Sequence, residues 1–252
     1  MIKQGDFIEL DFTAKLKETD KTFDTTLQDT AKKEDLPVDK ERLKPIKICV
    51  GKGMVIKGLD LALENKEEGK EYSIDINPEH AFGKRIPSLV RTIPEKIFLE
   101  KDVHPVRGMM LNLDNMVARV ISVSGGRVMV DFNNPLSGKV VTYHFKINRI
   151  IKDTKEKLAV LAENYLSKDS EIKLEDKKAT ITISSIFLKN KKTIENFVKM
   201  VKDMVGIEVK LEEKKAKEKK EEKTKEGKEL EAKIKSDENL TKKEEISRNK
   251  EE

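Results

Sequence analysis

Few side chains in this 252-residue sequence are of the types that carry covalent or metal chemistry. There is one cysteine, Cys49, and three scattered histidines, His80, His104 and His144, which no metal-ligand spacing connects. Cys49 lies in a strand-like run, with no helix N-terminus beside it to activate the thiol. We therefore expect a buried, inert thiol, no metal site and no cofactor.

The pair Phe23-Asp24 is a better candidate for chemistry. Apolar residues in a β-rich chain are usually core residues, and for Phe12 or Ile48 taken alone that interpretation is favoured. An acid beside a large aromatic residue has little packing value by itself. The pair therefore indicates a role in binding or catalysis.

The elements that must position this pair are mostly strands. Alternating apolar and polar residues predict strands at 8–16 and 71–76, and an apolar run predicts another at 46–50. Between them, residues 25–44 are typical of a long surface connection with one helical turn. Apolar residues on one face predict a short helix over 55–63.

Further along, two strand-like runs, 116–123 and 127–132, flank Gly125-Gly126 and predict a β-hairpin. The strand predicted at 140–151 could join either neighbouring β unit. Beyond Lys155 the pattern predicts an α-β-β-α-β domain. Its expected elements are 158–166, 171–174, 179–186, 194–205 and 207–211.

Composition and charge exclude some classes of protein. Charged residues make up 39% of the chain, yet residues 212–252 hold 14 acidic and 14 basic side chains, so this tail is a neutral polyampholyte and not a basic arm for nucleic acid. We find no apolar signal core at the N-terminus and no membrane-spanning run. A single cysteine fits a reducing compartment. We expect a cytoplasmic protein with no membrane and no specific nucleic acid as partner.

Three motifs, in order, resemble those of the FK506-binding (FKBP-type) peptidyl-prolyl cis-trans isomerases. Residues 44–59, KPIKICVGKGMVIKGL, resemble the strand and glycine turn that lead into Val-Ile-x-Gly. Residues 21–26, KTFDTT, resemble the family's Phe-Asp-Ser/Thr motif, and residues 77–83, NPEHAFG, its Pro-x-x-Ala-Tyr-Gly motif. Each motif alone is weak, but their order and spacing together are specific.

Two further segments resemble the ends of the insert-in-flap domain of SlyD-like members. These are IPEKIF at 93–98 and NPLSG at 134–138. The resemblance covers about residues 1–151, and beyond it the chain is similar to the archaeal long members only in outline. It implies an α+β fold, an antiparallel sheet wrapped on a short helix. The expected domains are an isomerase domain (1–83 plus 134–151), an insert-in-flap chaperone domain (84–133), an α/β domain (152–211) and the charged tail (212–252).

The resemblance also implies the site. An apolar hollow favours the twisted prolyl amide, which carries less charge separation than the planar one. Asp24 is expected as its one charged member, and the Ile56 N–H as the donor to a substrate carbonyl. The other site residues that the resemblance implies are Phe12, Phe23, Ile46, Val55, Leu59, Phe82 and Tyr143, with Leu136 at the rim.

The chain departs from the family pattern at three of these positions. Phe12 and Phe82 stand where many relatives carry tyrosine, and Leu59 where the small forms carry tryptophan. The hydroxyl absent at Phe82 removes one hydrogen bond, worth about 0.5–1.5 kcal/mol. We expect an active but slower isomerase with weakened affinity for FK506-type ligands.

The inserted region is rich in apolar residues, which suggests a second task. Methionine is flexible and suits varied apolar partners, so we hypothesise that the insert binds unfolded, proline-containing polypeptides. A plain packed core remains the competing interpretation. The residues expected to bind clients are Ile86, Leu89, Val90, Ile97, Phe98, Met109, Met110 and Met116.

Three alternatives stay open. The isomerase fold could have lost catalysis and serve as a holdase chaperone, or the chain could be a ribosome- or RNA-associated protein, prompted by its many lysines. The third domain could form a homodimer or bind clients. Its helix from Thr193 to Val205 could equally pack internally.

Overall fold

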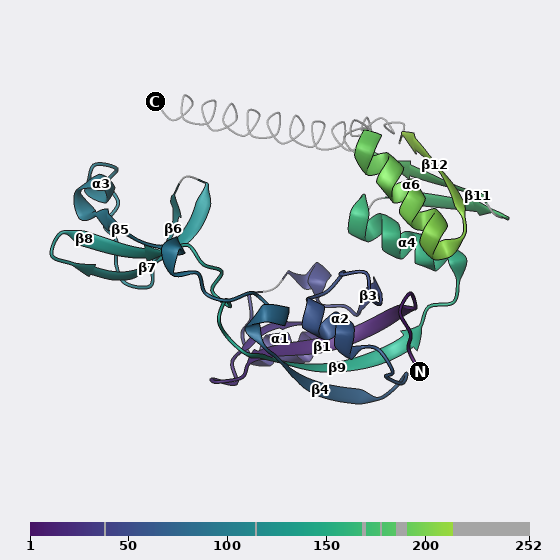
Figure 1. The fold of residues 1–252 in the computed structure, drawn as a ribbon, viewed down its shortest axis with the longest axis horizontal. Coiled ribbons are helices and arrows are strands. Elements are labelled where there is room, and N and C mark those ends of the chain that lie inside the picture. Colours follow the sequence, from purple (N-terminus) through teal and green to yellow (C-terminus); the bar gives the residue numbers. More distant parts are fainter. Residues whose placement is uncertain (38, 114, 168–169, 177, 185–190, 214–252) are drawn as a thin grey trace, which may run out of the picture.

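A computed structural model describes residues 1–37, 39–113, 115–167, 170–176, 178–184 and 191–213 (Figure 1). The described residues form three β-sheets with a few helices, which confirms the α+β class. The predicted charged tail lies outside them, apart from Glu212 and Glu213. No helix in the described part is long and apolar enough to cross a membrane.

The first sheet is antiparallel and has the order β2-β1-β9-β4, with β3 paired to the other half of β1. The strand left open by the sequence, β9, lies between β1 and β4, so it completes this sheet and not the inserted one. The strands are β1 (Phe7–Leu16), β2 (Thr22–Thr25), β3 (Ile46–Cys49), β4 (Glu71–Ile76) and β9 (Val141–Ile150).

Helix α2 (Lys57–Ala62) packs on this sheet, as predicted. The polar connection before β3 holds α1 (Gln28–Lys33) and the 3-10 helix η1 (Lys40–Arg42). Because side chains alternate along a strand, Ile8 and Leu10 of β1 face the cluster beneath α2, whereas Phe7 faces the opposite way. The sheet therefore has a packed surface on both sides at this end.

The second sheet lies in the inserted segment and has the order β5-β8-β7-β6. The predicted hairpin is present as β7 (Met116–Ser124) and β8 (Arg127–Asp131). The edge strands β5 (Val90–Pro94) and β6 (Met110–Leu113) were not predicted, because each is short and β5 ends in a proline. Helix α3 (Glu95–Leu99) places Phe98 in the core of this unit.

The third sheet has the order β10-β11-β12, with β11 and β12 parallel. A parallel pair needs a crossover, and α6 (Lys191–Val205) provides it. The remaining elements are α4 (Thr154–Tyr165), β10 (Glu171–Glu175), β11 (Lys178–Ile183) and β12 (Glu208–Glu213). Asp153 caps α4 by accepting a hydrogen bond from the Glu156 N–H at 2.7 Å.

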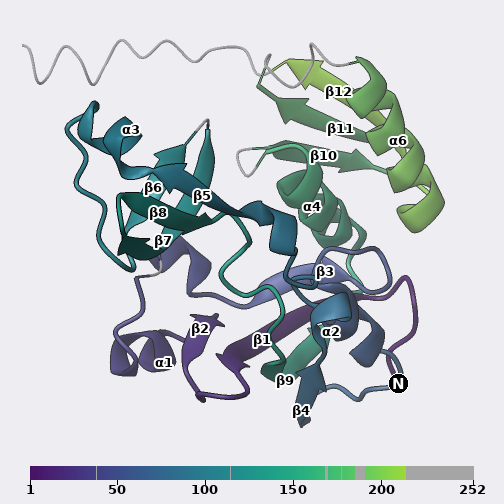
Figure 2. The same cartoon turned by 60° about the vertical axis from the view of Figure 1, so that its left-hand side comes forward.

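Helix α4 joins the third sheet to the first, and both views place it beside β3 (Figures 1 and 2). Phe7, Cys49 and Ile151 share one buried cluster with Leu158 and Leu161 of α4. Cys49 is buried, as predicted. The third sheet and its helices are thus held to the first sheet by a common core.

Ion pairs surround this shared core. Arg149 of β9 donates to Glu9 of β1 at 2.7 Å and to Glu156 of α4 at 2.9 Å. Lys47 of β3 lies 2.8 Å from Glu156. Hydrogen bonds from Arg149 and Lys47 lower the pKa of Glu156 to about 2. The position of α4 is therefore fixed by both apolar and charged contacts.

Replacing Glu156 by glutamine is expected to lower the thermal midpoint at pH 7 by roughly 2–4 °C. A carboxylate whose pKa is lowered on folding adds stability above its ordinary pKa, and this stability is lost as the pH falls toward the folded value. The difference from wild type should therefore shrink below pH 4.5 and vanish near pH 2. Thermal melts across this range test it, with Glu195→Gln on α6 as the control. An equal deficit at every pH would mean that packing, and not charge, is responsible.

Candidate functional site

Four aromatic rings meet at one end of the first sheet. Phe12 lies on β1, Phe23 on β2 and Tyr143 on β9, and Phe82 follows the 3-10 helix η2 (Pro78–His80). The ring centroids of Phe12 and Tyr143 are 5.5 Å apart. The Phe23 ring lies edge-on to Phe82 at 5.7 Å and to Tyr143 at 6.3 Å. Edge-to-face contacts at these distances are the favoured geometry for aromatic pairs.

Strand register explains why these residues meet. Ala14 of β1 pairs with Asp24 on one side and with Tyr143 on the other. The small side chain of Ala14 thus lies between strands that carry the larger groups. The register brings Phe23-Asp24 and Tyr143 together although they are far apart in the sequence.

Helix α2, the residues that lead into it and strand β3 contribute the aliphatic part of the site. Leu59 is buried in the cluster, and Ile46, Val55 and Ile56 pack against it half-buried. Among the described residues, no carbonyl is recorded as the acceptor of the Ile56 N–H. This N–H lies just before α2 and fits the expected role of a donor to a substrate carbonyl.

Asp24 is the charged group of this cluster. Burial raises its pKa, against the opposing effects of Arg42, 3.7 Å away, and of the Thr25 N–H, which donates to Asp24 at 3.0 Å. Burial, and secondly the negative charge of Asp24, raise the pKa of Tyr143 above its ordinary value. Both shifts indicate poor solvation, which is the property that an apolar prolyl site requires.

A hollow of about 310 Å³ lies beside this cluster. It takes in three of the predicted site residues, Phe12, Asp24 and Ile46. The predicted residues Phe23, Val55, Ile56, Leu59, Phe82 and Tyr143 belong to the adjoining cluster. Leu136 is half-buried on the loop after β8 and is not part of that cluster.

Two residues that support the site escaped the sequence analysis. Asp60 of α2 is buried and accepts hydrogen bonds from the Gly51 and Gly53 N–H groups, at 2.8 and 2.9 Å. It fixes the turn that leads to Val55 and Ile56. Arg42 of η1 pairs with Asp24. An acid on the apolar face of a short helix next to a two-glycine turn was the available signal for Asp60.

The glycine of the Val-Ile-x-Gly motif is explained by close packing. A Cβ on Gly58 would lie 2.2 Å from Cγ2 of the buried Ile76 and 3.2 Å from the His80 carbonyl oxygen. Only a glycine lets α2 approach β4 and the turn before Phe82. The motif therefore sets the distance between the aliphatic and aromatic parts of the site.

Gly58→Ala is expected to destabilise the protein by about 1–2 kcal/mol, because overpacking outweighs the gain in helix propensity. It should also lower prolyl-peptide turnover, since α2 carries the Ile56 N–H. Urea unfolding and a prolyl-peptide assay measure the two effects. The neighbouring exposed change Lys57→Ala should leave both unaltered. A Gly58→Ala protein of wild-type stability would show that the helix has room to move.

The predicted client-binding residues fall into three groups. Ile86, Ile97, Met110 and Met116 are exposed, Leu89, Val90 and Met109 are half-buried, and Phe98 is buried in the core of the inserted unit. Four exposed apolar residues of the inserted segment were not in the predicted set: Leu99, Val106, Val117 and Met129. In the described part of the chain, no cluster of three or more His, Cys, Asp or Glu side chains could hold a metal.

Two family models match the chain. Residues 1–99 match the FKBP-type peptidyl-prolyl cis-trans isomerase model, and residues 91–136 match the model of the FKBP26 IF domain. The second match covers the sheet β5-β8-β7-β6. The first match covers four of the five strands of the first sheet and ends before β9, and the two matches overlap at β5 and α3.

Curated relatives agree with these matches. The short-type peptidyl-prolyl cis-trans isomerase of Methanocaldococcus jannaschii is 31% identical over 150 residues, which is 60% of this chain and 94% of that protein. SlyD of Treponema pallidum is 34% identical over 44% of this chain and 65% of its own length. Among solved structures, the three FKBP domains of wheat FKBP73 align at 16% identity and a TM-score of 0.31, covering 60% of this chain and 40% of theirs.

The relative from Methanocaldococcus jannaschii is matched over 94% of its length. On this evidence, together with the family model over residues 1–99, the chain belongs to the FKBP-type peptidyl-prolyl cis-trans isomerases.

Proposed function

We propose that the cluster around Phe23 and Asp24 accelerates cis-trans isomerisation of X-Pro bonds in folding polypeptides. The observation that carries this proposal is the meeting of Phe12, Phe23, Phe82 and Tyr143 beside the half-buried Asp24. Isomerisation of an X-Pro bond breaks no covalent bond, so the cluster needs no nucleophile.

The physical argument concerns the prolyl amide. Its barrier of about 18–20 kcal/mol is lost resonance, and the twisted amide has less charge separation than the planar one. A poorly solvated site therefore favours the twisted form, while a donor such as the Ile56 N–H holds a neighbouring carbonyl in place. Asp24 would orient local dipoles. The remaining predicted residues shape the site, and Leu136 would border it.

A protease-free assay on a prolyl tetrapeptide tests this proposal. The expected result is exchange faster than the uncatalysed reaction, with weak inhibition by FK506 because Phe82 lacks the tyrosine hydroxyl. A rate equal to uncatalysed exchange would favour the alternative, an FKBP fold that acts only as a holdase.

We further propose that the inserted unit binds unfolded chain through the exposed apolar residues of its outer face, Met110, Val117 and Met129. Arg119 and Asp131 lie on the same face. Strand pairing places these side chains opposite the core of the unit. Met110, Val117 and Met129 are 51%, 62% and 39% exposed, where the solvated face of an antiparallel sheet is normally polar. Exposed apolar residues on a sheet face are typical of an interaction surface.

The same proposal divides the chain as the sequence suggested. An isomerase domain (1–83 plus 134–151) would carry the chaperone insert (84–133), followed by an α/β domain (152–211). The separate clusters of the first and second sheets support the first boundary. The cluster that Phe7, Cys49 and Ile151 share with α4 supports an α/β domain fixed to the isomerase domain.

A further inference from the structure

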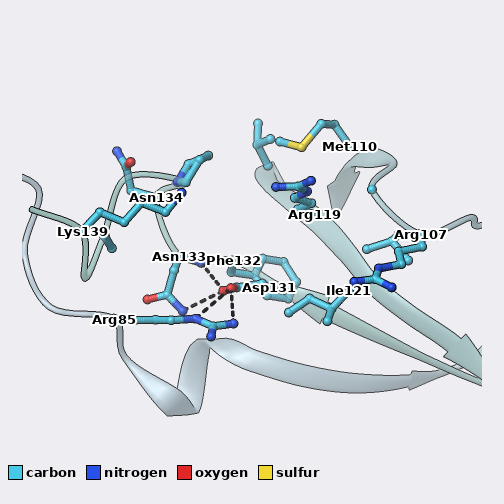
Figure 3. Close-up of a pocket in the computed structure, with 15 residues that line it drawn as sticks. Arg85, Arg107, Met110, Arg119, Ile121, Asp131, Phe132, Asn133, Asn134 and Lys139 are labelled. Atoms are coloured by element: carbon cyan, nitrogen blue, oxygen red, sulfur yellow. Dashed lines mark hydrogen bonds and ion pairs between the residues drawn. The ribbon is translucent and has the colours of Figure 1, made fainter. Parts of the chain in front are cut away.

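A hollow of about 660 Å³ lies against the outer face of the inserted sheet (Figure 3). One side is formed by Met110, Val117 and Arg119 of the sheet, and the other by the linker that returns to the isomerase domain, including Lys139. Arg107 stands at its margin, on the turn before β6. The hollow thus combines apolar and cationic groups, and we name it the cationic hollow.

The positive charge of the cationic hollow is only partly compensated. Asp131 pairs with Arg85 at 2.7 Å and also accepts two hydrogen bonds from Asn133, at 2.7 and 2.9 Å. In the described residues, no ion-pair partner is recorded for Arg107, Arg119 or Lys139, although Arg119 lies opposite Asp131 across the strands. Four cationic side chains therefore line the hollow, and Asp131, the one carboxylate among its lining residues, is already paired with Arg85.

The apolar lining indicates what kind of anion fits. Met110 and Val117 are the exposed apolar residues of the outer face, and Phe132 lies beside them. Phe132 is the one aromatic residue in the lining of the hollow, and Arg91 covers one face of its ring at 5.4 Å, so the hollow offers no series of rings on which successive nucleic-acid bases could stack. Apolar and cationic groups together match a peptide that carries a carboxylate next to an apolar side chain.

We propose that the cationic hollow selects client segments in which acidic and apolar residues alternate. The inference rests on the proposed binding of unfolded chain and specifies its preferred sequence. The position of the cationic hollow is also informative, because the linker that forms one of its sides is hydrogen-bonded to the segment that carries Phe82. The Ser137 hydroxyl donates to the Phe82 carbonyl at 2.9 Å, and the Gly138 N–H to the Gly83 carbonyl at 2.8 Å. An acidic segment bound here is held next to the isomerase domain.

Fluorescence anisotropy with three matched peptides tests this selection. Each peptide has 15 residues, no proline, an uncharged dye and alternating leucine with Glu, Gln or Lys. The full-length protein should bind the Glu peptide about tenfold more tightly than the Gln peptide at low salt, and the Lys peptide most weakly, with the difference lost in 0.5 M salt. The triple change R107Q, R119Q and K139Q should remove the preference for Glu while leaving affinity for the Gln peptide.

The matched control is the triple change K101Q, R127Q and K152Q, which removes the same charge from exposed sites outside the hollow. It should keep most of the preference. Equal loss in the control, or equal affinity for the Glu and Gln peptides in wild type, would overturn the inference but not the chaperone proposal. Failure to bind any peptide would overturn the chaperone proposal itself.

A 12-nucleotide RNA tests the other anionic ligand. If the wild-type protein bound this RNA more tightly than the Glu peptide, and if the variant R107Q, R119Q and K139Q lost that binding, the hollow would be a site for phosphate groups instead.

A second inference comes from a different cavity. The hollow beside Phe12, Asp24 and Ile46 is closed on one side by Glu163 and Asn164 of α4. Glu163 lies 3.8 Å from Lys44, next to β3, and the shared core and the Arg149 ion pairs hold α4 in place. We infer that the α/β domain contributes a wall of the prolyl site that contacts the client residue before the proline.

A tetrapeptide series with Lys, Glu or Leu before proline tests this second inference, which rests on the proposed prolyl site. Glu163→Lys should shift the ratio of kcat/KM for the Glu and Lys peptides severalfold toward Glu, with little change for Leu. Glu195→Lys on α6 makes the same charge change outside the hollow. An equal shift in both variants, or none in the first, would overturn the inference. Absent turnover in wild type would instead contradict the proposed site.

Discussion

Replacing Phe23 and Asp24 together by alanine is expected to reduce prolyl-peptide isomerisation to the uncatalysed rate while the chain remains folded. Phe23 contacts both Phe82 and Tyr143, so its removal opens the aromatic cluster to water. Loss of Asp24 removes a charged hydrogen-bonding group, typically worth about 1.5–3 kcal/mol, or roughly ten- to a hundredfold in rate. The two losses act on the same poorly solvated site.

The control for this variant removes an aromatic residue and an acid from the other edge of the same sheet. Tyr72 and Asp75 lie on β4, where Tyr72 stacks on Phe145 at 5.5 Å. Tyr72→Ala with Asp75→Ala should cost comparable stability and leave turnover within a few-fold of wild type. Circular dichroism and the protease-free assay give the two readouts. Equal loss of turnover in both double variants would mean that a disturbed sheet, and not a missing site, causes the effect.

Asp24→Asn separates catalysis from stability. Burial raises the pKa of Asp24 in the folded protein above its ordinary value of 3.8. The protonated carboxyl therefore adds to the free energy of unfolding below pH 3.8, and this contribution is lost as the pH rises through the pKa of the folded state. At pH 7 the ionised form therefore costs stability, and its 3.7 Å pair with the exposed Arg42 offsets little of that cost. We expect the variant to melt higher than wild type at pH 7, to lose this advantage near pH 3.5, and to turn over more slowly. A lower melting point at pH 7 would indicate a structural role for the carboxylate.

The sequence predicted the first sheet better than the inserted one, for physical reasons. Strand β4 alternates clearly because one of its faces is buried, β1 alternates in sequence from Ile8 onward, and the glycine turn marks the start of α2. Strands β5 and β6 are short edge strands with little alternation, so their pairing depends on partners distant in the sequence. The local pattern also left the partners of β9 open, because it does not fix which sheet a strand joins; only the resemblance assigned this strand to the isomerase domain.

For the candidate site, the sequence motifs named residues that the structure brings together, but they did not identify the residues that hold these in position. Phe23-Asp24, Val55-Ile56 and Phe82 stood out through the resemblance. Asp60 and Arg42 act through backbone geometry and a through-space ion pair, which no short motif encodes. The wall formed by α4 could not be predicted either, because Glu163 comes close only when Phe7 and Cys49 pack against the helix.

Deleting residues 84–133 is expected to slow refolding of a proline-limited protein far more than turnover on a tetrapeptide. No residue of this segment belongs to the cluster of the isomerase domain, so the remaining sheet should fold. The Gly138 N–H bonds to the Gly83 carbonyl at 2.8 Å, so a short glycine-serine linker can join the two ends. A tetrapeptide is too short to use a second binding surface, and its turnover should stay within a few-fold of wild type.

The deletion should lower the rate at which the protein catalyses refolding of this client by about a hundredfold. A client held by the insert reaches the prolyl site at a raised effective concentration, and the deletion removes this effect. A milder variant, Met110→Gln with Val117→Gln and Met129→Gln, leaves the inserted sheet in place and changes only its exposed apolar residues. It should reproduce most of the refolding defect and none of the tetrapeptide effect. If the deletion slowed both reactions equally, the insert would act by shaping the prolyl site. If the triple variant refolded clients normally, the outer face would not be the surface that binds them.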